Sequence, residues 1–510
     1  MTFRTLLCTL IALSLITTPG AAQDKKRSKK NRGRPYYPKL ANDKGKSFKD
    51  IPLGPLSAVA RVPFKGTECT IQGLDPQGLA ARAGLEIGDR IVAVGGLQFP
   101  TYQRKNSTGD RGAPQELARA IEKAQASRTP LLLSVVRDGK KPRTLKVSLP
   151  YLPRLQRGYP KSCPSSSHYR KAIHQRLLDL QRPDGSWHKN HAHTTMLAGL
   201  ALLASGDRRF HPAVQKTAQC MIQRTSAWGS QPTPEKLRTK GPKTWDTCAI
   251  GILLAEYHLA TGDRSVLRPL RLCCEAMAVR LQPQTGRLGH GHLKLPYSEK
   301  GLVIINTQAH LMWALAQRCG VPADEPAWKL SLECVRSALS KKNDGAVGYN
   351  HSARSGHQAG ARTGSMAAAL ALVKRENNLR KKMGTWLQDH VAEWPDAHAM
   401  SSIGILYGLA GLRLNRSANF TVGQEASRTA LILARLPDGS AAYYGSKGNI
   451  GGDSYLSHQV VGNAVAALIL SSGGEKLTLF GKSASRPATS PDPPRQESRP
   501  TPKKKKKGRS

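Results

Sequence analysis

The sequence predicts two folded units, a small β-rich domain followed by an all-α domain in which six helical hairpins form a closed double ring. The chain has 510 residues, which exceeds one typical domain. Short apolar runs with period-two alternation occupy residues 50–152, whereas amphipathic runs in pairs occupy residues 167–472. The second run of each pair carries little charge, as a helix buried on all sides requires.

The N-terminus is typical of a secretory signal peptide. An apolar run from Thr5 to Thr18 follows one arginine and ends at the small residues Gly20, Ala21 and Ala22. The run is shorter than a membrane span, and no later stretch is long enough. We therefore expect residues 1–22 to be removed and the mature chain to be exported to the periplasm or the extracellular space, without a transmembrane segment.

The chain is strongly basic, with a formal net charge of +44. Much of this charge lies in two arms that contain little to bury, residues 23–49 and the Pro/Ser/Lys-rich tail 473–510, which are expected to be disordered. The natural partners of such a chain are polyanions. For an exported protein, acidic polysaccharide or envelope surfaces are expected before nucleic acid, although a general effect on solubility remains an alternative.

Eight cysteines remain after removal of Cys8 in the signal peptide, and most fall inside helical patterns. An exported protein can form disulfides. Because a large domain does not need them, we expect mainly buried thiols and leave a bridge or two open.

Residues 50–152 are predicted to form about five short strands and one main helix. Four of these strands are expected at 67–72, 90–94, 131–137 and 144–149, the last two flanking an Asp138-Gly139 turn. The helix is expected at 114–126, where proline opens the run.

Within this unit, the segment Gly84-Leu85-Glu86-Ile87-Gly88-Asp89-Arg90-Ile91 resembles the glycine-leucine and glycine-aspartate pattern of bacterial PDZ domains. The resemblance implies a groove between a strand and the helix at 114–126, where an extended peptide or protein segment adds as a strand. It also implies a peptide-binding loop formed by Leu53, Gly54, Pro55 and Leu56. Pro52 and Pro55 lack the N–H groups that would hold a carboxylate. An internal segment or intramolecular docking therefore remains an alternative to a free C-terminus.

After a proline-rich linker at 153–166, the chain is predicted to be helical. The twelve helices are expected at 168–181 with 191–204, 211–224 with 245–260, 264–281 with 304–318, 326–340 with 361–375, 379–391 with 398–413, and 424–435 with 455–471. Connections from the first to the second helix of a pair are long and rich in glycine. These loops and the first turns of the inner helices are expected to share one face, where sites are usually built.

One of these long connections carries a family resemblance. Gln181, Asp184, Gly185, Ser186 and Trp187 resemble the Q-x-x-D-G-S-W motif of squalene cyclases and their prenyltransferase relatives, with weaker echoes at 343–345 and 436–440. The resemblance implies an (α/α)6 toroid, a fold that six-hairpin glycosidases also have. The aspartate-rich cyclase motif is absent, so the resemblance does not imply the reaction. The motif itself is expected to form a tight turn packed by its tryptophan.

The first turns of the inner helices supply the candidate catalytic or ligand-binding residues, which are Asp246, His310, Arg362, Asp396, His398, Asp453 and His458. Trp245, Tyr349 and Tyr455 are candidates for stacking on sugar rings. A glycoside hydrolase needs two carboxylates across the sugar, whereas a polysaccharide lyase would use a histidine or tyrosine base with Arg362 against a uronate.

A zinc site is a minor alternative. Asp246, Cys248 and His310 resemble the Asp-x-Cys and histidine ligands of protein prenyltransferases, which share this architecture. The simpler interpretation makes Asp246 a helix cap and Cys248 a core residue. We otherwise expect no cofactor.

These patterns predict an exported PDZ-containing protein that binds a peptide or protein through its β-rich unit and an anionic ligand, either polysaccharide or an envelope component, in the toroid. A polysaccharide-degrading enzyme with its active site at the same face is the alternative, and zinc-dependent prenyltransferase-like chemistry is a third hypothesis.

Overall fold

The computed structural model describes residues 47–105, 107, 109–155, 158–291, 301–352, 354, 358–396, 401–415, 420–442, 458–474 and 476–482. The predicted signal peptide, most of the N-terminal arm and the tail beyond residue 482 lie outside this range.

The N-terminal unit is an antiparallel sheet with the strand order β1-β2-β3-β4-β8-β9, in which β5 pairs with β4. A separate pair is formed by β6 and β7. The strands are β1 (Phe48–Leu53), β2 (Ala58–Pro63), β3 (Cys69–Leu74), β4 (Arg90–Val94), β5 (Leu97–Gln98), β6 (Arg104–Lys105), β7 (Gly109–Asp110), β8 (Leu131–Val136) and β9 (Arg143–Val147).

Helix α3 (Ala113–Ser127) packs on this sheet through Leu117 and Ile121, which are fully buried. The sequence predicted this helix and strands β3, β4, β8 and β9 in place. It did not predict the hairpin of β1 and β2, which are joined by the short 3-10 helix η1 (Gly54–Leu56). The apolar residues Ile51 and Leu53 provided the signal, but the prolines around them obscured it.

The Gly88-Asp89 turn is held by a buried carboxylate. Asp89 accepts hydrogen bonds from Arg137 Nε at 2.6 Å and Arg137 Nη2 at 2.8 Å, and from the N–H of Glu86 at 2.9 Å. These bonds tie the turn before β4 to the end of β8, next in the sheet. In this chain the glycine-aspartate pattern has a structural role.

The C-terminal unit consists of two layers of helices. The outer helices are α4 (Pro164–Asp179), α6 (His211–Thr225), α9 (Leu267–Val279), α11 (Glu325–Ser337), α13 (Asn377–Asp389) and α15 (Phe420–Ala434). The inner helices are α5 (Ala192–Ser205), α8 (Thr244–Thr261), α10 (Val303–Arg318), α12 (Gly360–Val373), α14 (Ser401–Leu414) and α16 (His458–Ser471). Short additional elements are α2 (Leu79–Arg82), α7 (Pro234–Thr239) and the 3-10 helices η2 (Arg208–Phe210), η3 (Ser226–Trp228), η4 (Arg264–Val266), η5 (Val391–Asp396) and η7 (Thr478–Phe480).

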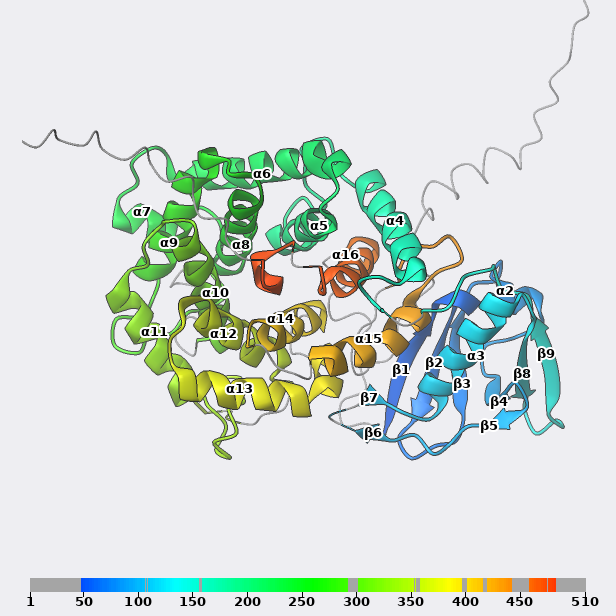
Figure 1. The fold of residues 1–510 in the computed structure, drawn as a ribbon. Helices are drawn as coiled ribbons and strands as arrows, with labels where there is room; N and C mark the ends of the chain where they lie inside the picture. Colours follow the sequence, from blue (N-terminus) through cyan, green and yellow to red (C-terminus); the bar gives the residue numbers. More distant parts are fainter. Residues whose placement is uncertain are drawn as a thin grey trace, which may run out of the picture.

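The inner helices form a closed ring (Figure 1). Each packs against the next in chain order, and α16 packs against α5. The residues of α8 and α10 are buried around most of their circumference, which explains their low content of charge. The predicted order, a β-rich unit followed by a helical toroid, is confirmed.

The end of the described chain closes one end of this ring. Leu477, Leu479 and Phe480 are fully buried. Buried Glu256 on α8 accepts the N–H groups of Thr478 at 2.9 Å and Leu479 at 2.7 Å. The folded domain thus extends beyond residue 473, where the sequence analysis placed the start of the tail.

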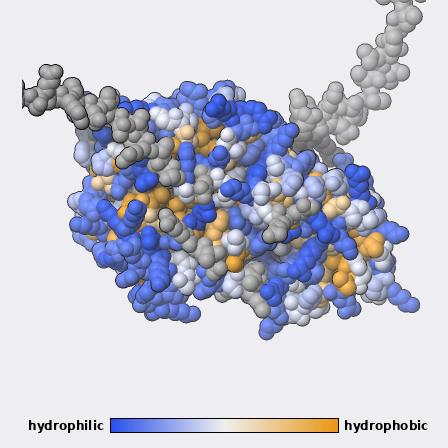
Figure 2. Space-filling model, viewed as in Figure 1, coloured by the Kyte–Doolittle hydropathy of each residue, from blue (hydrophilic) through white to orange (hydrophobic). Residues whose placement is uncertain are grey.

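The surface in the view of Figure 2 is mostly hydrophilic. No described helix is long and apolar enough to cross a membrane. The eight cysteines from Cys69 to Cys334 are buried thiols, in agreement with the expectation from the sequence.

Candidate functional site

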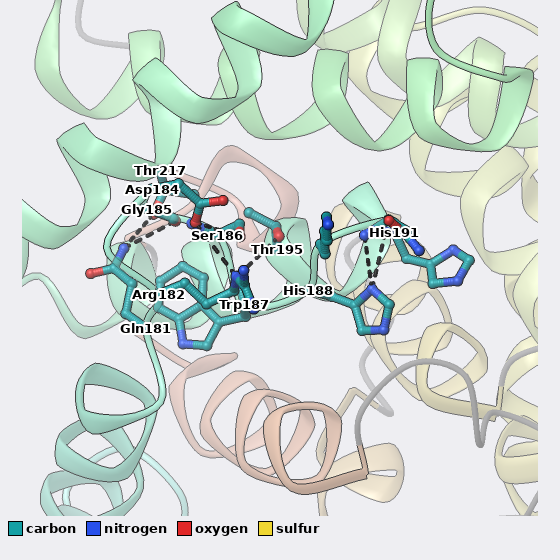
Figure 3. Close-up of polar contacts among 12 residues, drawn as sticks. Gln181, Arg182, Asp184, Gly185, Ser186, Trp187, His188, His191, Thr195 and Thr217 are labelled. Carbon is teal, nitrogen blue, oxygen red and sulfur yellow. Dashed lines mark hydrogen bonds and ion pairs between the residues drawn. The ribbon is translucent and has the colours of Figure 1, made fainter.

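The Gln181–Trp187 motif is a packed turn (Figure 3). Asp184 Oδ1 accepts the backbone N–H of Ser186 at 3.0 Å and its hydroxyl at 2.7 Å, and Gly185 has a φ of +81°. Gln181 Nε2 donates to the carbonyl of Ala213 and the hydroxyl of Thr217 on α6, while Trp187 Nε1 donates to the carbonyl of Leu177. Since these polar groups are engaged within the protein, the motif positions helices, as its sequence predicted.

The same turn recurs around the ring. In three copies, a backbone N–H at the end of the turn donates to a side chain of the following inner helix, and the acceptors are Thr195, Thr363 and Asn463. A fourth copy, in which Gln282 N donates to Arg287 O, went unnoticed in the sequence because it lacks the Asp-Gly pair. The turn glycines Gly185, Gly286 and Gly345 each lie against the next outer helix, and Gly439 lies against α4, which closes the outer layer.

A cluster of aromatic and imidazole rings lies at the first turns of α5 and α8. The half-buried Trp245 ring meets the His193 ring edge-on, with centroids 5.4 Å apart, and stacks on His290 at 6.1 Å. Trp245 Nε1 donates to His290 Nδ1 at 2.8 Å. His193 Nε2 lies 3.0 Å from Gln308 Oε1 of α10. We call Trp245, His193, His290 and Gln308 the first-turn cluster.

Asp246 lies beside this cluster and caps α5. Its Oδ1 accepts the N–H of Ala192 at 2.8 Å, so the carboxylate stabilises a helix N-terminus. The residue is only partly buried. Asp246 therefore joins two neighbouring inner helices. It caps α5 and not its own helix α8, whose N-cap position is Lys243 without a side-chain cap hydrogen bond.

Basic side chains lie around the cluster. The pKa of His188, on the loop before α5, is lowered first by partial burial and then by its neighbours His191, Arg224 and Arg182, against the opposing effect of Asp246. Burial also lowers the pKa of His193, so this ring is neutral near pH 7. The first-turn cluster thus consists of neutral rings with basic side chains around them.

Arg362, in the first turn of α12, lies beside Tyr349. The guanidinium is buried, with Nε donating to the carbonyl of Val347 at 2.8 Å, and it lies 5.9 Å from the Tyr349 ring centroid. Burial lowers the pKa of Arg362 to about 10. The arginine is a packed structural cation, which weakens its predicted role against a uronate.

The predicted zinc ligands do not come together. Among the described residues, which include Asp246, Cys248 and His310, no group of His, Cys, Asp or Glu side chains could hold a metal ion. Cys248 is a fully buried core residue, and burial raises the pKa of its thiol. His310 points to the outer layer, with its ring 4.3 Å from that of Trp328, and burial lowers its pKa to about 3. In the described structure these three side chains do not form a common site, because Asp246 bonds to the N-terminus of α5, Cys248 lies in the core and His310 packs against Trp328.

The remaining predicted site residues are outside the described part. These are His398, Asp453 and Tyr455, together with the side chains of Asp396 and His458. Their assignment as catalytic, binding or stacking residues stays a prediction.

The predicted peptide loop of the sheet unit is covered by the toroid (Figure 1). Leu53, Gly54, Pro55 and Leu56 are buried, and a Cβ built on Gly54 would lie 2.8 Å from the carbonyl oxygen of Arg435. Helix α15 contacts β1, η1 and α3, and β1 pairs along the edge of β2. In this arrangement the loop is not available to an incoming peptide, because a helix of the same chain occupies its surface.

A protein-family model matches the toroid. The model of DUF6288, described as a domain of unknown function, matches residues 171–481, which is more than half of the chain. The chain belongs to the DUF6288 family. The DUF6288 match begins within α4 and extends through η7, so it includes the segment that closes one end of the ring. The N-terminal sheet lies outside it.

Several solved structures are similar to the DUF6288 region at low identity. An α-mannanase of glycoside hydrolase family 76 from Bacteroides thetaiotaomicron is 12% identical, with a TM-score of 0.43 and coverage of 60% of this chain and 94% of that chain. A family 88 glycosyl hydrolase from Bacteroides vulgatus is 13% identical, with a TM-score of 0.40 and coverage of 60% and 98%. A type II terpene cyclase from Scytonema is 13% identical, with a TM-score of 0.38 and coverage of 61% and 99%. No curated protein matches the chain.

Proposed function

We propose that this protein is an exported binding protein whose toroid holds an anionic polysaccharide or envelope glycan at the first turns of the inner helices. The observation that carries the proposal is the half-buried Trp245 ring, set between His193 and His290. Aromatic rings with a polar handle are suited to surfaces that are apolar on one side and wet on the other, as the face of a sugar is.

The charge around Trp245 supports an acidic ligand. The pKa of His188 is lowered in part by its cationic neighbours, and the exposed Lys189 and Lys243 lie on the adjoining loops. The nearby carboxylate of Asp246 is engaged with the N–H of Ala192. Basic side chains around a binding site favour a polyanionic ligand and raise its rate of association.

Substitution of Trp245 tests this proposal. We expect Trp245→Ala to weaken binding of an acidic polysaccharide such as alginate or polygalacturonate about tenfold, equivalent to ~1.4 kcal/mol, through loss of the stacking face. Trp245→Phe keeps a ring and should retain most of the affinity. Tyr151→Ala, an exposed aromatic on the sheet unit, is the matched control. Titration calorimetry on the full mature chain measures all three, and equal affinities of Trp245→Ala and wild type would refute the proposal.

Glycan cleavage is a second candidate function, favoured by His193. The neutral imidazole beside Trp245, held by Gln308, has the protonation state that a general base requires. If the protein is a lyase, incubation with polygalacturonate releases unsaturated ends that absorb in the ultraviolet. His193→Asn would then abolish release while binding persists. Binding without any product identifies the protein as a binding protein only.

A further inference from the structure

A cavity of about 900 Å³ lies where the first and last helical hairpins meet. Helices α4, α5 and α16 pack against one another here (Figure 1), and the cavity is lined at the ends of α5 and α16 and along the first turns of α4. The 14 residues of α5 place it about 20 Å from the first-turn cluster, at the other face of the ring. It is therefore separate from the site proposed above, and we call it the seam cavity.

The described lining of the seam cavity is cationic. Five basic side chains contribute, and a single carboxylate, that of Asp207, opposes them; the five are Lys161, Arg170, Lys171, Arg209 and Lys476. Asp207 is already engaged, since Arg209 Nε lies 2.9 Å from its Oδ2. The described lining thus has a marked excess of positive charge, which favours an anionic ligand.

Arg170 is held in place from both sides of the seam. Its Nη1 donates to the carbonyl of Leu470 on α16 at 2.8 Å and to the carbonyl of Pro160 at 3.1 Å. Both printed acceptors of Arg170 among the described residues are neutral carbonyl oxygens. A guanidinium fixed by neutral acceptors keeps its charge available, and a rigid cation loses little entropy when it binds an anion.

Two buried polar groups on the wall of the cavity have no partner among the described residues. His174 is 4% exposed and its Nε2 has no hydrogen bond, while the Oγ of Ser471, 5% exposed, has none either. The His174 ring bonds to the backbone carbonyl of Ala201. Because a carbonyl only accepts, the ring donates through Nδ1, which leaves Nε2 of the neutral ring as an acceptor. Buried polar atoms are normally satisfied, so these two call for a ligand or water.

The cationic lining and the unpaired acceptor on His174 together indicate which chemical groups the ligand carries. Fixed and mobile cations suit a carboxylate or phosphate, whereas the acceptor on His174 suits a hydroxyl donor beside that group. We propose that the seam cavity binds an acidic sugar, with its anionic group against Arg170, Lys171 and Lys476 and a hydroxyl donating to Nε2 of His174. The site is independent of Trp245 and of the polysaccharide proposed for the opposite face.

The test uses the full mature chain with glucuronate and glucose 6-phosphate as probes, and sulfate as an anion without a hydroxyl donor. Lys171 and Lys476 are exposed, so the double variant Lys171→Gln/Lys476→Gln should fold normally. We expect it to weaken binding of an acidic sugar about tenfold. The double variant Lys123→Gln/Lys146→Gln removes the same charge from exposed positions of the sheet unit and should bind as wild type does.

A third variant addresses the hydroxyl. His174→Phe keeps a ring against Phe210 but removes the acceptor, so affinity for the acidic sugar should fall about fivefold while affinity for sulfate is unchanged. Trp245→Ala should leave all three probes unaffected, which separates this site from the proposed polysaccharide site. No binding of either sugar, equal losses in the two double variants, or unchanged sugar affinity in His174→Phe would each overturn the proposal. Saturation-transfer NMR and titration calorimetry supply the affinities.

Discussion

The glycines of the recurring turn set the distance between successive hairpins. Gly185 has a φ of +81°, and a Cβ at this position would lie 2.3 Å from the carbonyl oxygen of Lys216 on the next outer helix. A side chain here would therefore strain the backbone and push α6 outward. The sequence disclosed the turn through the Asp184 and Gly185 pair, but the contact with α6 depends on a residue 31 positions away and could not be predicted from local pattern.

Alanine substitution separates these two effects. We expect Gly185→Ala to lower the free energy of unfolding by about 3 kcal/mol or more, from the left-handed backbone and the collision with Lys216 together. Gly262→Ala is the control, because Gly262 has a φ of +77° with nothing within 4 Å, so it should lose only about 1 kcal/mol. Denaturant titrations of both variants provide the comparison. Equal losses would show that the contact with Lys216 is unimportant.

At the scale of elements, the alternation of charged and apolar helices was sufficient to predict all six hairpins. Period and composition identify a helix and the number of its buried faces, as for α8. They do not identify what lies beyond the last hairpin. Residues 476–482 contain Leu477, Leu479 and Phe480 within a polar stretch, and the contact of Thr478 and Leu479 with Glu256 of α8 shows that the segment is folded. That contact joins residues 222 and 223 positions apart.

The attachment of this segment should depend on pH. Burial raises the pKa of Glu256 from 4.5 to about 7, despite the N–H groups of Thr478 and Leu479, which lower it. The folded state therefore holds a proton that the unfolded state releases between these values, so the contribution of Glu256 to stability is highest below pH 4.5 and falls as the pH rises to 7. The loss amounts to roughly 3 kcal/mol.

Comparison with Glu256→Gln isolates this contribution. Between pH 4.5 and 7, the unfolding free energy of wild type should fall relative to that of Glu256→Gln. Above pH 7 the difference between the two should stay constant. Glu275→Gln, at an exposed position of α9, controls for the loss of one carboxylate. Parallel stability curves for wild type and Glu256→Gln would contradict the proposed protonation.

At the scale of the molecule, helix α15 belongs to both folded units. Leu431 packs in the core of the toroid, whereas Leu433, two residues later and fully buried, packs in the core of the sheet unit. Glu122 of α3 reinforces the junction by accepting from Arg428 Nη2 at 3.1 Å and from the N–H of Leu155 at 2.8 Å. Two separate units were predictable from the change of periodicity near residue 152. Their union was not, because SRTALILAR in α15 has the composition of an ordinary outer helix, whose second apolar face has no visible partner in the sequence.

The position of Leu433 predicts that the two units unfold together. Leu431→Ala and Leu433→Ala should each lower stability by about 2–5 kcal/mol, since both remove a buried leucine. Only Leu433→Ala weakens the junction, so calorimetry should give one transition for wild type and Leu431→Ala but two for Leu433→Ala. Hydrogen exchange at residues 54–57 should accelerate in Leu433→Ala alone, because α15 covers this loop. Two transitions in wild type, or identical behaviour of both variants, would mean that the units are merely adjacent. If the junction does loosen as expected, the uncovered loop becomes the surface on which to test the predicted peptide binding, which the closed arrangement prevents.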